Sequence, residues 1–250
     1  MSIFITGDCH GEYTKFNAEN FKRQKDLTKN DYMIVAGDFG YWDNSPDQIW
    51  WRKWLEDKPF TTLFIDGNHE NYDMLAELPV TEWNGGKVQF VNDSIIHLMR
   101  GQVFNIDGTT FFAFGGARSH DIRDGIFEKG SAELKNIMAR EHKTHEYLMY
   151  RVNHESWWKE EMPNENEMEE GLINLEKAGN KVDYIVTHEG PSSNVRLFGR
   201  GFEPDAFSEY LEKIRVKASY KEWFFGHYHV DMRAYAGRET VLYDKIYQIA

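Results

Sequence analysis

The sequence has little cysteine and no long apolar segment, and both shortages limit what the protein can be. Its 250 residues include one cysteine, Cys9, so the chain cannot form an internal disulfide bond. A chain without disulfides suits a reducing compartment, and we expect a cytoplasmic protein. No apolar run approaches the ~20 residues that a membrane helix needs. Residues 1–5 lack the basic residues and cleavage site of a signal peptide, so we expect neither secretion nor a membrane partner.

Basic residues are also in deficit. The chain has 29 lysines and arginines against 41 aspartates and glutamates, a net charge of −12 with neutral histidines. This excess argues against long nucleic acid and anionic membranes as partners, but leaves room for a local site that binds a small phosphorylated substrate. The composition, 41 % hydrophobic and 15 % aromatic, is that of a folded protein. The carboxylates and the ten histidines of this acidic chain supply oxygen and nitrogen ligands for metal ions.

The chain shows no internal repeat and no low-complexity linker, so we predict a single domain over residues 1–250. Short apolar runs that end in glycine or polar clusters predict strands at residues 2–6, 32–36, 62–65, 184–187 and 223–225. Further strands are expected at 88–91, 95–99, 103–106 and 110–114, and within 232–249. Apolar spacing predicts helices over 13–25, from Pro46 onward, and over 165–178 and 205–216. This order predicts an α/β fold of two packed mixed sheets flanked by helices, a four-layer α/β/β/α sandwich.

Metal-ligating side chains follow five of the predicted strands. Because ligand sites of α/β sheets lie beyond the carboxyl ends of the strands, these side chains can converge. Imidazole and carboxylate groups together suit Mn, Fe, Zn, Ni or Co. Seven ligands are too many for one tetrahedral ion but suit two ions roughly 3.5–4 Å apart that share a carboxylate. The candidate ligands are Asp8, His10, Asp38, Asn68, His188, His227 and His229.

The motifs in their order resemble the calcineurin-like metallophosphoesterase superfamily. Each motif alone is weak, since Gly-Asp and His-x-His occur by chance, but five in order, each after a strand-like run, form a specific pattern. The pattern spans residues 8–229, nearly the whole chain. It reads Asp8-x-His10, Gly37-Asp38, Gly67-Asn68-His69-Glu70, His188 and Gly226-His227-x-His229.

The resemblance implies a role for each motif residue. Asp8, His10 and His229 would hold a first metal ion. Asn68, His188 and His227 would hold a second, and Asp38 would bridge the two. A hydroxide between the ions would attack phosphorus. His69 would protonate the leaving alkoxide as general acid, and His10 would assist as a second catalytic residue.

The second motif departs from the pattern of the protein Ser/Thr phosphatases in this superfamily, which continue Gly-Asp-x-Val-Asp-Arg. Here Tyr41 stands in place of the second Asp, and Trp42 in place of the phosphate-binding Arg. The departure counts against a protein phosphatase. It also leaves the usual partner of His69 unassigned, for which Asp43 and Glu70 are the substitutes.

Several other residues have both a functional and a plain structural interpretation. Arg118 could bind a substrate phosphate, as could the metal-site residue Asn68, although Arg118 could equally form a surface salt bridge. Arg196 and Arg200 are further candidates of the same kind. Cys9 suits a core position better than a nucleophile.

Remaining histidines and aromatic residues are expected to be structural. We expect His97 in a strand, and His142, His145 and His154 on a solvated, helical surface. The tryptophans at 50, 51, 54, 157 and 158 suit the core better than a substrate cleft. The acidic run 160–170 is expected to form a solvated helix face and its lead-in.

The sequence therefore predicts a hydrolase, a dinuclear metal-dependent phosphoesterase acting on a small phosphomonoester or phosphodiester. A nuclease or cyclic-nucleotide phosphodiesterase is the alternative within the enzymes. A non-catalytic interaction scaffold that keeps the fold is the alternative of another class, and the presence of all seven ligands disfavours it. The physiological substrate, the choice between monoester and diester, the metal identity and the oligomeric state stay open.

Overall fold

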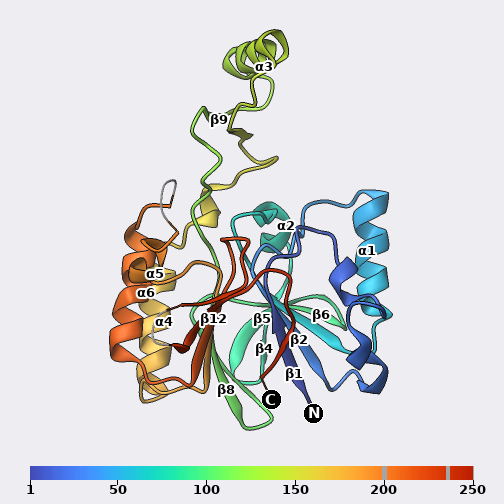
Figure 1. Cartoon of the computed structure of the whole chain (residues 1–250), viewed down its shortest axis with the longest axis vertical. Helices are drawn as coiled ribbons and strands as arrows, with labels where there is room; N and C mark the ends of the chain where they lie inside the picture. Colours follow the sequence, from blue (N-terminus) through green and yellow to red (C-terminus); the bar gives the residue numbers. More distant parts are fainter. Residues whose placement is uncertain (199–201, 235–236, 250) are drawn as a thin grey trace.

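The computed structural model of the chain describes residues 1–198, 202–234 and 237–249 (Figure 1). Two β-sheets pack face to face, and helices cover their outer faces. Among the described residues, no helix is long and apolar enough to cross a membrane. A narrow arm, residues 121–158, projects from this body and carries the helix α3 at its tip.

The first sheet has seven strands, four of which run parallel at its centre. Its order is β15 (Tyr247–Gln248), β1 (Ile3–Thr6), β2 (Tyr32–Ala36), β3 (Thr61–Ile65), β6 (Ile95–Leu98), β5 (Gly86–Asn92) and β4 (Val80–Trp83). The parallel strands are β1, β2, β3 and β6, whereas β15, β5 and β4 pair antiparallel. The carboxyl ends of the parallel strands therefore share one edge of the molecule.

The second sheet has six strands and is also mixed. Its order is β13 (Met232–Ala234), β14 (Glu239–Val241), β12 (Glu222–Phe225), β11 (Tyr184–Thr187), β8 (Thr109–Phe114) and β7 (Gln102–Ile106). The four inner strands are parallel, and the two at the edges pair antiparallel.

Alternation of side chains along the strands divides the apolar residues between three cores. In β2, Ile34 and Ala36 face the core between the sheets, while Met33 and Val35 face the outer helices. The same alternation holds in β12, because successive side chains of a strand point to opposite faces. Both sheets are thus buried on both faces, and the predicted four-layer sandwich is confirmed.

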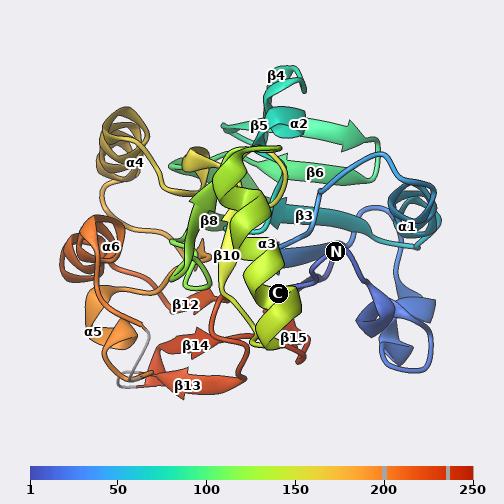
Figure 2. The same ribbon diagram turned by 90° about the horizontal axis from the view of Figure 1, so that it is seen from above.

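Helices cover the two outer faces (Figure 2). The first sheet is covered by η1 (Thr14–Phe16), η2 (Lys22–Asp26), α1 (Pro46–Glu56) and α2 (Tyr72–Ala76). The second is covered by α4 (Glu165–Lys177), α5 (Ser192–Val195) and α6 (Ala206–Lys217). Capping residues fix where they begin: the Ser45 side chain accepts from the Gln48 N–H before α1, and Asn164 and Glu167 form a capping box at α4.

The prediction of one helix over residues 13–25 is wrong. The structure has two short 3₁₀ helices there, η1 and η2. Between them the Asn17 side chain accepts hydrogen bonds from the backbone N–H groups of Glu19 and Asn20, at 2.9 and 2.7 Å. Such local side-chain bonds replace the bonds a continuous helix would make. Phe16 and Phe21 are buried, as their apolar character suggested.

The arm contains β9 (Gly125–Phe127), α3 (Ala132–Thr144) and β10 (Tyr150–Val152), and returns to the body through η3 (Lys159–Glu161). The two strands pair with each other in a separate small sheet. His142 lies in α3, His145 ends it with φ +55°, and His154 follows β10; all three are exposed as predicted.

The tryptophans divide between core and surface. Trp51 and Trp54 pack against the core beneath α1, and Trp158 is buried, as predicted. Trp157 is only partly buried. Trp50 is 56 % exposed, so its core prediction is wrong, because it lies on the solvent side of α1.

A buried ionic network ties the end of β3 to the base of the arm. The Asp66 carboxylate accepts from Arg100 Nε at 2.8 Å and lies 3.1 Å from His97 Nε2. Arg100 also donates to the Tyr72 hydroxyl and to the backbone oxygen of Glu160. Burial opposes ionisation of Asp66, but the Arg100 charge holds the pKa of Asp66 below its usual range. His97 is therefore structural, as expected.

Replacing one member of this network should be costly. We expect Arg100→Met to destabilise the fold by about 3–5 kcal/mol, because it leaves the Asp66 carboxylate buried without its cation. The matched control is Lys87→Met. It breaks the Lys87–Glu170 pair on the surface, where both side chains are more than a third exposed, and should cost at most about 1 kcal/mol. Urea unfolding of both variants measures the difference, and equal losses would contradict the assignment.

Candidate metal centre and catalytic site

The ends of five parallel strands from both sheets meet at one edge of the molecule. Each of these strands is followed by a loop that carries one or more of the predicted site residues. Asp8 and His10 follow β1, Asp38 follows β2, Asn68 and His69 follow β3, His188 follows β11, and His227 and His229 follow β12.

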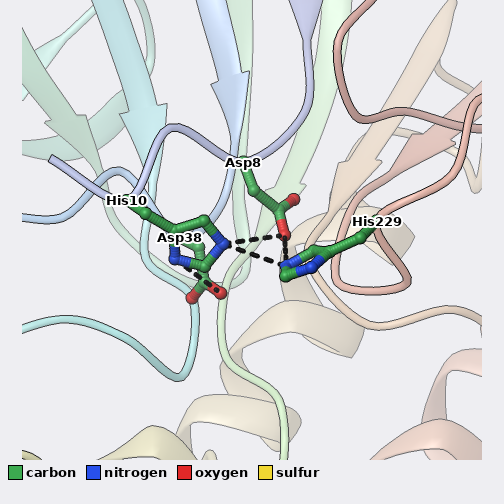
Figure 3. Close-up of side chains that lie close together, drawn as sticks. All are labelled: Asp8, His10, Asp38 and His229. Atoms are coloured by element: carbon green, nitrogen blue, oxygen red, sulfur yellow. Dashed lines mark hydrogen bonds and ion pairs between the residues drawn. The ribbon is translucent and has the colours of Figure 1, made fainter. Parts of the chain in front are cut away.

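The first cluster consists of Asp8, His10, Asp38 and His229, whose ligand atoms all lie within 4.8 Å of one another. Figure 3 shows the four side chains pointing toward one another from the loops that follow β1, β2 and β12. His229 Nε2 lies 3.2 Å from Asp8 Oδ2 and 3.0 Å from His10 Nε2. His10 Nδ1 lies 3.8 Å from Asp38 Oδ2. Three residues predicted for a first metal ion are thus adjacent to the predicted bridging carboxylate.

The second cluster consists of Asp38, His188 and His227, with ligand atoms again within 4.8 Å. His188 Nε2 lies 3.2 Å from Asp38 Oδ1 and 3.3 Å from Asn68 Oδ1, which adds Asn68 to the group. His188 Nδ1 lies 2.9 Å from the Ala36 carbonyl oxygen. Since that oxygen can only accept, Nδ1 carries a proton, and Nε2 is the ring nitrogen that faces the cluster. Asp38 belongs to both clusters.

The charges in the site are strongly coupled. Burial alone would raise the pKa of Asp38, but the neighbouring His188 holds it well below its usual range. Conversely, burial would lower the pKa of His188, yet the Asp38 carboxylate raises it to about 10. Burial lowers the pKa of His227 well below its ordinary value, and His188 adds to this effect. The carboxylate of Asp38 is therefore ionised, as a bridging ligand requires.

The donor set fits two divalent ions. Asp8 Oδ2 is fully buried and makes no hydrogen bond, although two imidazoles face it. A buried carboxylate oxygen without a donor is costly unless a cation compensates it. Carboxylate, amide oxygen and imidazole groups are the ligands of Mn, Fe, Zn, Ni and Co in proteins. A third group, in which His120 and Glu189 join His227, lies beside the second cluster.

Backbone strain accumulates at these loops. Four of the seven candidate ligands have positive φ values: His10 (+50°), Asp38 (+45°), His227 (+71°) and His229 (+50°). Non-glycine residues rarely adopt this region, and where they do, the surrounding structure holds them there. The spacing of the motifs alone gives no sign of this strain.

Gly37 explains why a glycine precedes the bridging aspartate. Its φ is +87°, and a Cβ atom added there would lie 2.1 Å from Nδ1 of His188. A glycine is required both by this backbone conformation and by the ring that packs against it. The same close approach recurs at Gly67, where a Cβ atom would lie 2.1 Å from Asp38 Oδ1.

A cavity of about 210 Å³ lies over the clusters. Its lining includes the predicted general acid His69, whose ring lies 5.4 Å from that of His10. The backbone N–H of His69 donates to Asp38 Oδ1 at 2.8 Å, which fixes the loop to the bridging carboxylate. The full lining is Asp38, Asn68, His69, His120, Asp121, Phe202, His227, Tyr228 and His229.

The two residues considered as partners of His69 are engaged elsewhere, so this expectation is wrong. The Glu70 carboxylate is buried and accepts from the backbone N–H groups of residues 39–41. Burial, helped by the charge of Asp38, raises the pKa of Glu70 to about 8. Asp43 Oδ1 accepts from the Ser45 N–H ahead of α1. Trp42 donates its indole N–H to the His69 carbonyl, so it contacts the backbone of His69.

Ser119 and Glu161 are site residues that sequence reasoning missed. Asn68 Nδ2 donates to Ser119 Oγ at 3.4 Å, and Ser119 donates its hydroxyl and backbone N–H to the Glu161 carboxylate at 2.5 and 3.0 Å. These hydrogen bonds orient the side-chain amide of Asn68 so that its Oδ1 atom faces His188. Glu161 was expected on a solvated face, but only 2 % of it is exposed, because it reaches inward to Ser119.

The candidate arginines lie apart from the cavity. Arg118 is exposed and is absent from the described lining, so the structure does not bring it to the clusters. Arg196 pairs with Glu209 of α6 at 3.3 Å. Arg200 lies outside the described residues. Cys9 is buried and its thiol pKa is raised to about 12 by burial, which agrees with a core role.

Comparisons with known proteins add an independent line of evidence. The family model of calcineurin-like phosphoesterase matches residues 1–231. Lariat debranching enzyme A of Xenopus laevis is 31 % identical over 145 residues, which cover 52 % of this chain and 26 % of that protein. Lariat debranching enzyme of Gallus gallus is 24 % identical over 96 % of this chain and 45 % of its own length. The chain thus spans less than half the length of these relatives.

One solved structure with a similar arrangement is phosphopantetheinyl hydrolase from Mycobacterium tuberculosis. It covers 97 % of this chain and 88 % of its own, with 14 % sequence identity and a TM-score of 0.48.

Gly37→Ala should remove metal from the second cluster, because the new Cβ atom would displace the His188 ring. The matched control is Gly108→Ala, whose φ of +83° is similar but which has no atom within 4 Å. Metal content by mass spectrometry, with circular dichroism to check folding, separates the two. Normal metal content in folded Gly37→Ala protein would refute the role of this glycine.

Ser119→Ala should weaken metal binding about 10–100-fold, because the Asn68 amide loses the acceptor that orients it. Isothermal titration calorimetry with Mn²⁺ measures the affinity. Ser131→Ala, which removes the cap of α3 at the tip of the arm, is the control and should leave the affinity unchanged. If both variants bind the metal like the parent protein, the hydrogen-bond chain has no part in holding the ion.

Proposed function

Because the chain belongs to the calcineurin-like phosphoesterase family, and is therefore a metal-dependent phosphoesterase, we propose that it hydrolyses small phosphodiesters. The charge of the cavity carries this proposal. Among the described residues, no lysine or arginine lines it, and Asp121 adds a carboxylate. Two divalent ions held by Asp8 and Asp38 leave only a small positive charge. A diester with one negative charge matches this site better than a monoester with two.

The ligands are assigned as the sequence predicted. Asp8, His10 and His229 would hold one ion, Asn68, His188 and His227 would hold the other, and Asp38 would contribute to both. When bound, the two ions supply Lewis acidity and lower the pKa of water at the site. The family uses two divalent ions, and their identity is open among Mn, Fe, Zn, Ni and Co. The ligands come from both sheets, which supports treating residues 1–250 as one domain.

His69 acts as general acid. It lines the cavity beside the clusters, and the bond from its backbone N–H to Asp38 holds it near the reacting phosphorus. The oxygen of water joins phosphorus as the P–O bond to the leaving alcohol breaks, and an imidazole nitrogen of His69 gives its proton to the oxygen of that alcohol. The proton that the water releases then restores the protonated His69. His10 belongs to the first cluster, and its ring lies 5.4 Å from that of His69 in an edge-to-face arrangement, so it assists by orienting the His69 ring.

The substrate is compact rather than a long polyanion. The net charge of −12 repels extended nucleic acid, and the cavity of about 210 Å³ suits a small ester. The relatives named lariat debranching enzymes favour a second candidate, the debranching of a lariat. The single cysteine, buried and free, supports a cytoplasmic location.

The wild-type enzyme with Mn²⁺ should hydrolyse bis-p-nitrophenyl phosphate with a kcat/KM at least about tenfold above that for p-nitrophenyl phosphate, equivalent to about 1.4 kcal/mol of transition-state stabilisation. Release of nitrophenol measures both rates, and enzyme stripped by chelator is the control. A higher kcat/KM for p-nitrophenyl phosphate would contradict the proposed diester and indicate a monoester as the substrate. A lariat substrate in the same series tests the second candidate.

His69→Ala should keep both metal ions but lower kcat about 10²–10⁴-fold on an ester with a poor leaving group. The loss should shrink for bis-p-nitrophenyl phosphate, because nitrophenolate leaves without protonation. His142→Ala, on the exposed face of α3, is the matched control. Full activity of His69→Ala on the unactivated ester would remove His69 as the acid.

A further inference from the structure

A second cavity adjoins the one over the clusters, and His69 lines both. This side cavity has a volume of about 560 Å³. One wall comes from the body, with Trp42 and Asn71 beside His69. The other comes from the base of the arm, with Arg151 and Trp158. The base of the arm thus forms one wall of the space that lies on the far side of His69 from the metal clusters.

The place of His69 decides which half of the substrate can enter the side cavity. A general acid must lie beside the oxygen of the leaving alcohol, so that alcohol extends past His69. We propose that the side cavity binds the leaving alcohol of the phosphodiester and selects an alcohol that carries a planar aromatic ring. This inference rests on the proposed function and names the leaving group for that site.

Two indoles in the side cavity are held in fixed orientations. Trp42 Nε1 donates to the His69 carbonyl oxygen at 2.9 Å, and Trp158 Nε1 donates to Asp73 Oδ2 at 2.7 Å. Trp42 remains 37 % exposed, whereas Trp158 is 4 % exposed. Since both polar N–H groups are already bonded and Trp158 is buried, what the side cavity offers a ligand is the exposed ring surface of Trp42. Stacking on such a surface binds a planar ring with little regard to its substituents.

The cations of the side cavity are already paired, which argues against a second phosphate as its occupant. Lys129 pairs with Glu155, and Arg151 pairs with Asp121. His154 Nδ1 lies 2.8 Å from Asp73 Oδ2. A charged leaving group would have to break these pairs, whereas a neutral alcohol leaves them intact. The side cavity therefore fits an uncharged ring-bearing alcohol.

Two methyl phosphodiesters test the proposal directly. Methyl phenyl phosphate and methyl hexafluoroisopropyl phosphate share the retained methyl half, and their leaving alcohols have similar acidity. Only the first has a planar ring. In each reaction the oxygen of water joins phosphorus, the P–O bond to the alcohol breaks, and that alcohol leaves with the proton from His69. The Mn²⁺-loaded wild-type enzyme should favour the phenyl ester, and the ratio of the two kcat/KM values measures ring recognition.

Trp42→Leu should lower this ratio about tenfold, because it removes the stacking surface. Trp42→Phe keeps a ring but loses the N–H bond to His69, so it should lower both rates together and preserve most of the ratio. Trp50→Leu, an exposed tryptophan on α1, is the matched control and should leave the ratio unchanged. Metal content verifies that each variant keeps its ions.

A ratio that is the same in wild type, Trp42→Leu and Trp42→Phe would overturn the proposal, because Trp42 would then act only through the backbone of His69. A wild-type preference for the hexafluoroisopropyl ester would overturn it as well. Failure of the proposed function would look different, since the wild-type enzyme would then hydrolyse neither ester.

Discussion

The carboxylate of Asp38 is the point on which the rest of the site depends. One oxygen lies near His10 of the first cluster, and the other lies 3.2 Å from His188 of the second. To reach both, the backbone of Asp38 adopts a φ of +45°, with a glycine on its N-terminal side. The same carboxylate accepts the backbone N–H of His69, so the two candidate metal clusters and the proposed general acid share one anchor. Moving this carboxylate would disturb both clusters and the position of His69 at once.

This constraint explains the packing around the strand ends. The loops after β2 and β11 approach so closely that the His188 ring fills the space where a Cβ of residue 37 would be. Such an approach is possible only because the two sheets face each other across a shared apolar core and present their carboxyl ends at one edge. Apolar burial on both faces of each sheet holds the strained loops in place. The free-energy cost of a few strained residues is small beside the stabilisation that burial of the three cores provides.

The sandwich and the residues that gather in the two clusters could be predicted from the sequence because their signals are local. Asp8 and His10 directly follow an apolar run, and their residue types together with their spacing define the motif. The partner of His69 could not be predicted, because nothing in the sequence says that Glu70 turns toward residues 39–41. Glu161 looked like part of an acidic surface run, and only the return of the arm brings it to Ser119. These contacts join residues 29 to 42 positions apart and leave no local pattern, and the pairing of β15 with β1 is another example.

The distribution of charge between the surface and the site bears on which substrates the protein would accept. A net charge of −12 would seem unsuited to an anionic substrate, yet the attraction needed is supplied within the site rather than by the surface. Because no lysine or arginine is among the described residues that line the cavity, affinity for the phosphoryl group would come from the bound ions. On the proposed function, a substrate would gain further binding energy from its uncharged parts. The side cavity would provide that contact through the exposed ring of Trp42, since the cations at the base of the arm are already paired. An acidic protein could in this way select a compact diester through its metal site and an aromatic wall, while its surface charge would repel long polyanions.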